Sequence, residues 1–206
     1  MKVLKAKLYE MELEKRDKEI ADNRVCITSD KAYALNYITE NDLKDPELKS
    51  TYDHRPFCAG MASVPNLIAS LDYCKDFDYL CLTGDIMDFC SEGTTELAKK
   101  YIFDRFKNVL ACIGSHDITK NVQTGKRDKL TFEQRLDRIR PFWSNDLEYD
   151  SVVLDNKVML ITMNDEDILT ENGPREIFSE NEYEKLLADI KRAREENLII
   201  LLFVHV

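Results

Sequence analysis

The sequence lacks several features that would place it in a common functional class. No C-x-x-C pair occurs among its six cysteines, which excludes zinc-ribbon and dithiol redox motifs. Residues 1–24 contain neither a long apolar run nor a small-residue cleavage site. We therefore expect a cytoplasmic, reduced protein with no export signal and no membrane anchor. Residues 124–127 resemble a phosphate-binding loop only superficially, because the G-x-x-x-x-G-K-[ST] spacing is missing.

Positive charge is also scarce, with 29 Lys and Arg against 39 Asp and Glu and a net charge of -10. Such a surface repels a phosphate backbone, so nucleic acid and anionic membranes are disfavoured as partners. The 206 residues and their 44% hydrophobic content suffice for one domain with a real core.

Apolar strands alternate with amphipathic helices along the chain. The pattern predicts strands at residues 25–28, 79–83, 108–113, 151–154, 157–163 and 198–204. It predicts helices at residues 64–75, 95–106, 131–140 and 180–196, the last opened by a Ser179–Glu182 capping box. Residues 4–20 fit either a helix laid over the fold or an edge segment, and residues 30–55 read as a long polar loop. This alternation indicates an α/β architecture.

Polar residues follow four of the predicted strands at their carboxyl ends. They are Ser29-Asp30, Gly84-Asp85-Ile86-Met87-Asp88, Gly114-Ser115-His116-Asp117 and His205. In open α/β sheets ligands bind outside the carboxyl ends of the strands, so these groups are expected to converge. Carboxylates and imidazoles suit Mn, Fe or Zn. The sequence therefore predicts one metal site assembled from distant segments.

This order of motifs resembles the calcineurin-like metallophosphoesterases, whose strands end in D-x-H, G-D, G-N-H-[DE], a lone H and finally G-H-x-H. The resemblance spans residues 24–206 and leaves residues 1–23 as a charged N-terminal segment. It implies a four-layer αββα sandwich. The last motif does not occur up to Val206, so we expect the sandwich to be incomplete at the C-terminus.

The resemblance also implies residue roles. Asp30 would be a ligand of the first metal, Asp85 would bridge both metals, and His205 would be a ligand of the second. His116 would protonate the leaving oxygen or stabilise the transferring phosphoryl group, with Asp117 orienting it. The resemblance implies two divalent metal ions (Mn, Fe or Zn) as cofactors. It implies a small phosphorylated substrate as the partner, either a phosphomonoester or a phosphodiester.

Two ligand positions depart from the family pattern, because Ala32 stands where D-x-H has histidine and Ser115 where G-N-H has asparagine. Two readings follow: a hydrolase with impaired activity, or a catalytically inactive phosphoesterase-fold module for binding or interaction. His54 and Arg55 are candidates for a surrogate metal ligand and a phosphate contact, or are solvated loop residues.

Structural roles remain open for the same residues. Asp30 and Asp85 are alternatively turn or helix caps, and His116 and His205 structural histidines. Residues 164–167 are expected to form a solvated acidic loop, although they follow a strand at a position where the family often has a polar residue near the site. The apolar final strand, residues 198–204, must either pair within the sheet or be buried against another subunit. In the second case the chain would form a homo-oligomer.

Overall fold

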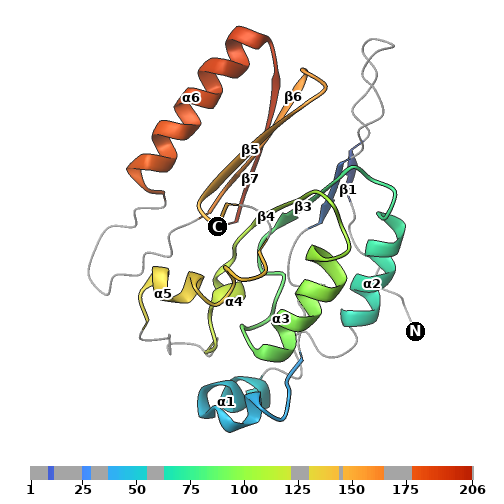
Figure 1. Cartoon of the computed structure of the whole chain (residues 1–206), viewed down its shortest axis with the longest axis vertical. Helices are drawn as coiled ribbons and strands as arrows, with labels where there is room; N and C mark the ends of the chain where they lie inside the picture. Colours follow the sequence, from blue (N-terminus) through green and yellow to red (C-terminus); the bar gives the residue numbers. More distant parts are fainter. Residues whose placement is uncertain are drawn as a thin grey trace.

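The chain folds into two β-sheets flanked by helices in a computed structural model (Figure 1). The structure describes residues 9–11, 25–28, 37–54, 63–121, 130–143, 146–164 and 178–205. One sheet has the strand order β1-β2-β3-β4 and the other β5-β6-β7. The α/β class predicted from the sequence is therefore confirmed.

The seven strands of the described part are β1 (Tyr9–Met11), β2 (Val25–Thr28), β3 (Tyr79–Thr83), β4 (Val109–Cys112), β5 (Tyr149–Leu154), β6 (Val158–Met163) and β7 (Ile199–Val204). The α-helices are α1 (Pro46–His54), α2 (Ser63–Tyr73), α3 (Glu92–Ala98), α4 (Ser115–Ile118), α5 (Phe132–Leu136) and α6 (Glu180–Glu196). A 3₁₀ turn, η1 (Asp42–Lys44), precedes α1, and a π-helical turn, η2 (Lys99–Phe103), continues α3.

In the first sheet, β2, β3 and β4 run parallel, and β1 pairs with β2 in the antiparallel sense. Parallel neighbours need crossover connections, and here α2 leads into β3 while α3 leads toward β4. In the second sheet β7 is parallel to β6. Because parallel strands end at the same edge, the loops after β3 and β4 lie side by side.

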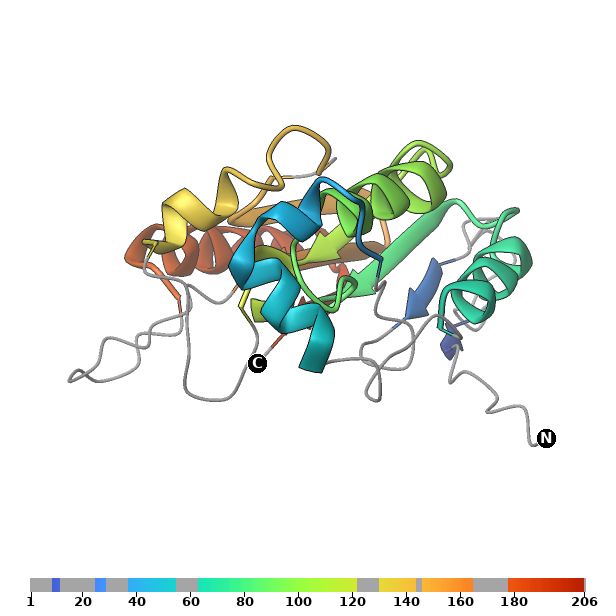
Figure 2. The ribbon, with the colours of Figure 1, turned by 90° about the horizontal axis from the view of Figure 1, so that it is seen from below.

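Side chains alternate across the strands and form three apolar clusters. Leu80 and Leu82 pack with α2 and α3 on one face of the first sheet. Cys81 faces the other way and packs with Leu160 between the two sheets. On the far face of the second sheet, Met159 packs in a cluster that includes residues of α6. Figures 1 and 2 accordingly place α2 and α6 at opposite sides of the molecule.

Several predicted boundaries were wrong. The helix predicted over residues 131–140 ends at Leu136, and the strand predicted from residue 151 starts at Tyr149. Residues 46–54, expected within the long loop, form α1, whose first residue is Pro46, a residue favoured at that position because its φ is already helical. The helix predicted to start at residue 95 begins at Glu92, because Ser91 caps it by accepting a bond from the backbone of Thr94. The partner in this capping box is threonine rather than the Glu or Gln typical of the pattern.

Other expectations hold. Residues 9–11 form an edge strand, one of the two readings of the N-terminal segment. The β5–β6 hairpin turns through Asp155 and Asn156, with φ of 50° and 54° as a two-residue turn of the favoured hand requires. Among the helices that the structure describes, none combines the length and apolar character that a membrane span requires. The division of the chain into residues 1–23 and 24–206 stays a prediction.

Candidate functional site

Three of the predicted site residues meet although they come from three separate strands. Asp85 follows β3, His116 lies in the loop and short helix after β4, and His205 follows β7. Nε2 of His205 lies 3.5 Å from Oδ2 of Asp85. The backbone N–H of His116 donates to Oδ1 of Asp85 over 3.1 Å. The expected convergence at the carboxyl edge is thus found for these three residues.

A tight turn positions the Asp85 carboxylate. Gly84 and Asp85 have φ of 87° and 51°, a left-handed pair that a β-branched residue would not adopt. A Cβ at Gly114 would collide with the carboxylate and the backbone nitrogen of Asp85, so only glycine allows this approach. A Cβ at Gly84 would likewise press on the ring of His205. The glycines of both motifs are therefore explained by close packing around Asp85.

His205 is held in one ring orientation. Its Nδ1 lies 2.7 Å from the backbone carbonyl of Thr83, which can only accept a hydrogen bond, so Nδ1 carries a proton and Nε2 is directed at Asp85. The hydrogen bond to Asp85 raises the pKa of His205 to about 9, against the opposing effect of burial. Burial raises the pKa of Asp85, but the bond from His205 and the charges of both histidines outweigh it, so its pKa is lowered overall.

His116 contacts a residue to which the sequence assigned no role. Its Nδ1 lies 2.8 Å from the backbone carbonyl oxygen of Asp88, and the Asp88 carboxylate is 3.6 Å from the same nitrogen. Asp88 is almost completely buried, whereas the His116 side chain is 22% exposed. The ring is thus anchored on its inner side and accessible on its outer side. Asp88 lies three residues after Asp85 in the same polar run, and this spacing is the sequence signal that could have pointed to its contact with His116.

Asp117 is fully buried and joins the loops after β3 and β4. Its Oδ1 accepts the N–H of Met87 and its Oδ2 accepts the N–H of Gly114, each over 2.8 Å. Burial, and then the charge of Asp85, raise the pKa of Asp117 to about 7. The structure therefore gives this carboxyl a positioning role, and its predicted orientation of His116 stays a prediction.

Asn164 is a second residue near the site that was not assigned a site role. Its Oδ1 accepts the N–H of Ile113 and its Nδ2 donates to the carbonyl of Leu147, both over 2.6 Å. The side chain is 1% exposed, so placing Asn164 in a solvated loop was wrong. It ties the end of β6 to the end of β4, directly before Gly114. Residues 165–167, the rest of that acidic run, lie outside the described residues.

The described residues supply two metal donors at this site, Asp85 and His205. Over the parts of the chain that the structure describes, no group of three or more His, Cys, Asp or Glu side chains is arranged to hold a metal ion. Asp30, Ala32 and Arg55 lie outside the described residues, as does the side chain of His54. Ser115 opens α4 and is exposed.

Neither a comparison with models of known protein families nor a search of curated proteins finds a match to this chain.

Proposed function

We propose that the chain is a metallophosphoesterase of the calcineurin-like kind, a hydrolase acting on a phosphomonoester or phosphodiester with divalent metals. One observation carries the proposal: Asp85, His116 and His205, which follow three different strands, lie within contact distance at one edge. The finer description of the fold as a four-layer αββα sandwich belongs to the same proposal. It is supported by the apolar cluster between the two sheets and by the helices packed on their outer faces.

The two described donors suit a metal ion. A histidine that donates through one ring nitrogen to a backbone carbonyl presents its other nitrogen as a ligand, and His205 has this arrangement with Thr83. A carboxylate 3.5 Å from that nitrogen leaves room for an ion shared by both groups. Asp30 is the further ligand that the motif order assigns. The metals would supply a polarised phosphoryl oxygen and a water of lowered pKa.

His116 would act on the substrate itself. Its ring is anchored through Nδ1 to the backbone carbonyl of Asp88, and its side chain is 22% exposed. An imidazole at that position can donate a proton to the leaving oxygen or a hydrogen bond to the phosphoryl group. The buried carboxylate of Asp88 lies 3.6 Å from Nδ1 of the same ring and helps to fix its position.

A second function, a binding module without turnover, is favoured by the ligand positions themselves. Ala32 has no donor atom and Ser115 has only a hydroxyl in the positions where the family pattern has His and Asn. Under this reading Asp85 and His205 form a structural ion pair, and a phosphorylated ligand would bind without being cleaved.

Metal analysis and hydrolysis assays test these readings together. The purified chain is dialysed against Mn, its metal content is measured, and hydrolysis of p-nitrophenyl phosphate and bis-p-nitrophenyl phosphate is followed with and without Mn. If the chain is a hydrolase, we expect turnover that depends on Mn. His116→Ala should lower this turnover by about 100-fold or more, while Mn remains bound. Asp85→Asn and His205→Ala are expected to lose the metal as well.

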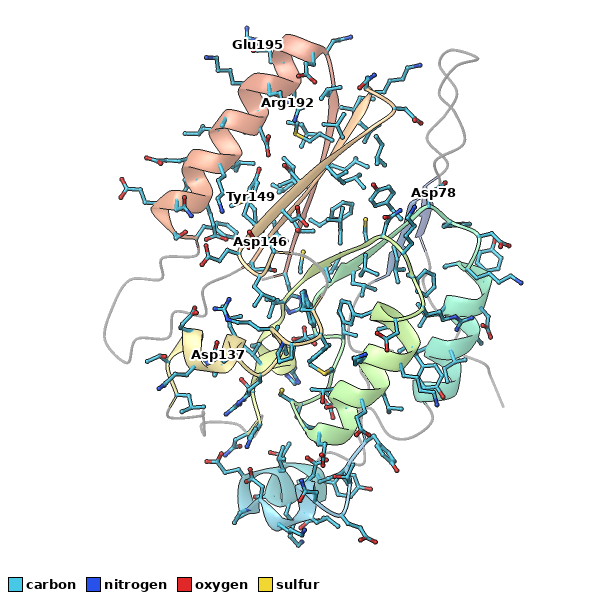
Figure 3. The ribbon with its side chains drawn as sticks, in the orientation of Figure 1. Asp78, Asp137, Asp146, Tyr149, Arg192 and Glu195 are labelled. Atoms are coloured by element: carbon cyan, nitrogen blue, oxygen red, sulfur yellow. The ribbon has the colours of Figure 1, made fainter. Side chains whose placement is uncertain are left out.

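Asp78→Asn is the matched control, because Asp78 is an exposed carboxylate just before the start of β3, at the opposite end of the strand from Asp85 (Figure 3). It should leave metal content and rate unchanged. Turnover that survives His116→Ala contradicts the mechanism. Bound Mn without turnover identifies the module, and failure of the chain to bind Mn removes the metal site altogether.

A further inference from the structure

Residues 37–54, to which the function proposed above gives no role, make hydrogen bonds to two distant parts of the chain. The segment contains η1 and α1, and Figure 1 places α1 near the start of α3. One set of bonds goes to the first turn of α3, and the other goes to Lys120, shortly after α4. These two places follow the loops that carry Asp88 and His116. We call residues 37–54 the brace.

At its first attachment, the brace binds the open end of α3 through Asp42. Oδ1 of Asp42 accepts the N–H of Glu92 over 2.7 Å, and Oδ2 accepts the N–H of Gly93 over 3.0 Å. No carbonyl within the helix can accept these N–H groups, because they belong to its first turn. Asp42 is 5% exposed, so the carboxylate makes both charge-assisted bonds away from water, where such bonds are strong. Asp42 thus completes the cap that Ser91 begins.

The backbone of the brace packs against the same turn of α3. The Ser91 hydroxyl donates to the carbonyl of Tyr37 over 2.7 Å. A Cβ at Gly93 would lie 2.7 Å from the ring of Tyr37 and 3.0 Å from its backbone. Any larger residue at Gly93 would therefore push the brace away from α3.

At its second attachment, α1 binds the chain that follows α4. The hydroxyl of Thr51 donates to the backbone carbonyl of Lys120 over 2.8 Å, and Nζ of Lys120 pairs with Asp45 over 2.8 Å. Leu48 lies one turn before Thr51 on the same face of α1, and the two residues are 3% and 0% exposed. This face of α1 is therefore buried, and the helix is held at a fixed place beside Lys120.

The brace continues a series of contacts between the loops after β3 and β4. The first contact joins the backbone carbonyl of Asp88 to Nδ1 of His116 over 2.8 Å. The second joins the N–H of Cys90 to the carbonyl of Thr119, also over 2.8 Å. The brace comes next, because it connects residues 91–93 with Lys120. It therefore lies at the end of the series, beyond the contact that holds the ring of His116.

This position lets the brace control how often the two loops separate. Loops at the surface open locally, and the contacts at the end of a series break before those inside it. A displacement of about 1 Å at a group that takes part in a reaction can lower the rate by about 100-fold. Residues of the brace can thus affect the ring of His116 without contacting a substrate.

We propose that residues 37–54 brace the two loops of the candidate site, and that Asp42 and Thr51 are positioning residues that keep the ring of His116 on the carbonyl of Asp88. The effect on the position of the ring is independent of any reaction. The effect on catalysis rests on the function proposed above.

The ring of His116 can be observed directly, because the chain has three histidines. Imidazole NMR signals are recorded on the purified chain without added metal and assigned with His54→Gln and His205→Gln. Asp42→Ala and Thr51→Val should each shift and broaden the signals of His116. The signals of His205 should stay in place, because that ring is bonded to Thr83 at the end of β3. Backbone hydrogen exchange in residues 85–91 and 114–120 should become about tenfold faster or more.

Ser179→Ala is the matched control. It also removes a helix cap, but that of α6, which lies at the far end of the molecule from α1 (Figure 1). It should leave the signals of His116 unchanged. Circular dichroism verifies that each variant folds. Should Asp42→Ala not fold, Thr51→Val decides alone, because it keeps the branched shape of the side chain and removes only the hydroxyl.

Hydrolysis of p-nitrophenyl phosphate with Mn separates this proposal from the function on which its catalytic part rests. Asp42→Ala and Thr51→Val should lower kcat by about tenfold and change KM by less than about twofold, because neither residue contacts the substrate. If the signals of His116 respond but the unaltered chain has no activity, the brace stands and the hydrolase is wrong. Signals that do not respond to either variant, or that respond equally to Ser179→Ala, overturn the brace.

Discussion

At the scale of single residues, Asp85 connects most of the site. Its left-handed backbone lets its carboxylate receive the N–H of His116 while facing the ring of His205. Sequence reasoning found these three residues because each follows the end of an apolar strand, a local pattern. It missed the role of Asp88 and the burial of Asn164, since their partners lie 28 and 51 residues away and leave no periodic trace.

Asn164 provides a prediction about stability. Asn164→Ala removes the acceptor of the Ile113 N–H and the donor to the Leu147 carbonyl, leaving both groups buried without these partners. We expect a loss of about 2–3 kcal/mol in the free energy of unfolding, measured by urea denaturation. Asn181→Ala, at an exposed position in the first turn of α6, is the control and should change stability by less than about 0.5 kcal/mol.

The cysteines of the central strands give a chemical prediction. Burial, followed by the charge of Cys112, raises the pKa of the Cys81 thiol to about 12, and burial does the same for Cys112. At pH 8 only about one thiol in ten thousand is then the reactive thiolate. Iodoacetamide should leave both cysteines unmodified in the native protein and label them in denaturant, as peptide mass spectrometry can establish. Rapid native labelling would contradict their placement between the sheets.

At the scale of elements, the strands and α6 were predictable and α1 was not. β3, β4 and β6 are largely buried apolar runs bounded by turn residues, and β7 is an apolar run with partly exposed side chains. α1 is short, polar and largely exposed, so no apolar periodicity announces it. Asp45, just before it, accepts the N–H of Glu47 over 2.9 Å and also pairs with the distant Lys120 over 2.8 Å.

The capping box of α6 gives a prediction at this scale. The Ser179 hydroxyl accepts the N–H of Glu182 over 3.2 Å, and the Glu182 carboxylate accepts the N–H of Ser179 over 2.7 Å. Ser179→Ala should lower the free energy of unfolding by about 1 kcal/mol, whereas Ser179→Asp should retain most of it. Thermal denaturation measures both, and equal losses from the two variants would mean that the cap does not stabilise the helix.

At the scale of the whole molecule, the α/β class follows from the alternation of patterns, but the assignment of strands to two sheets does not. Each core strand is apolar on both faces, so its sequence does not reveal which neighbour it meets. That the two sheets pack face to face follows only from the resemblance to a known family or from the coordinates.

The cluster between the sheets predicts that they unfold together. Leu160 of β6 is fully buried against the first sheet, and Leu160→Ala should cost about 3 kcal/mol. Trp143, the one tryptophan of the sequence, packs in the cluster on the outer face of the first sheet and reports on that part alone. In this variant the urea midpoint of unfolding followed by Trp143 fluorescence should fall by the same amount as the midpoint followed by circular dichroism. A shift in circular dichroism alone would indicate two independently unfolding halves.

The bond between His205 and Thr83 spans 122 residues of sequence. Closing so long a segment costs chain entropy before any contact repays it, so this junction is expected among the last events of folding. Interactions absent from the folding transition state act on the rate of unfolding. An ion held between Asp85 and His205 would consequently prolong the lifetime of the native state and leave the speed of its formation almost unaltered.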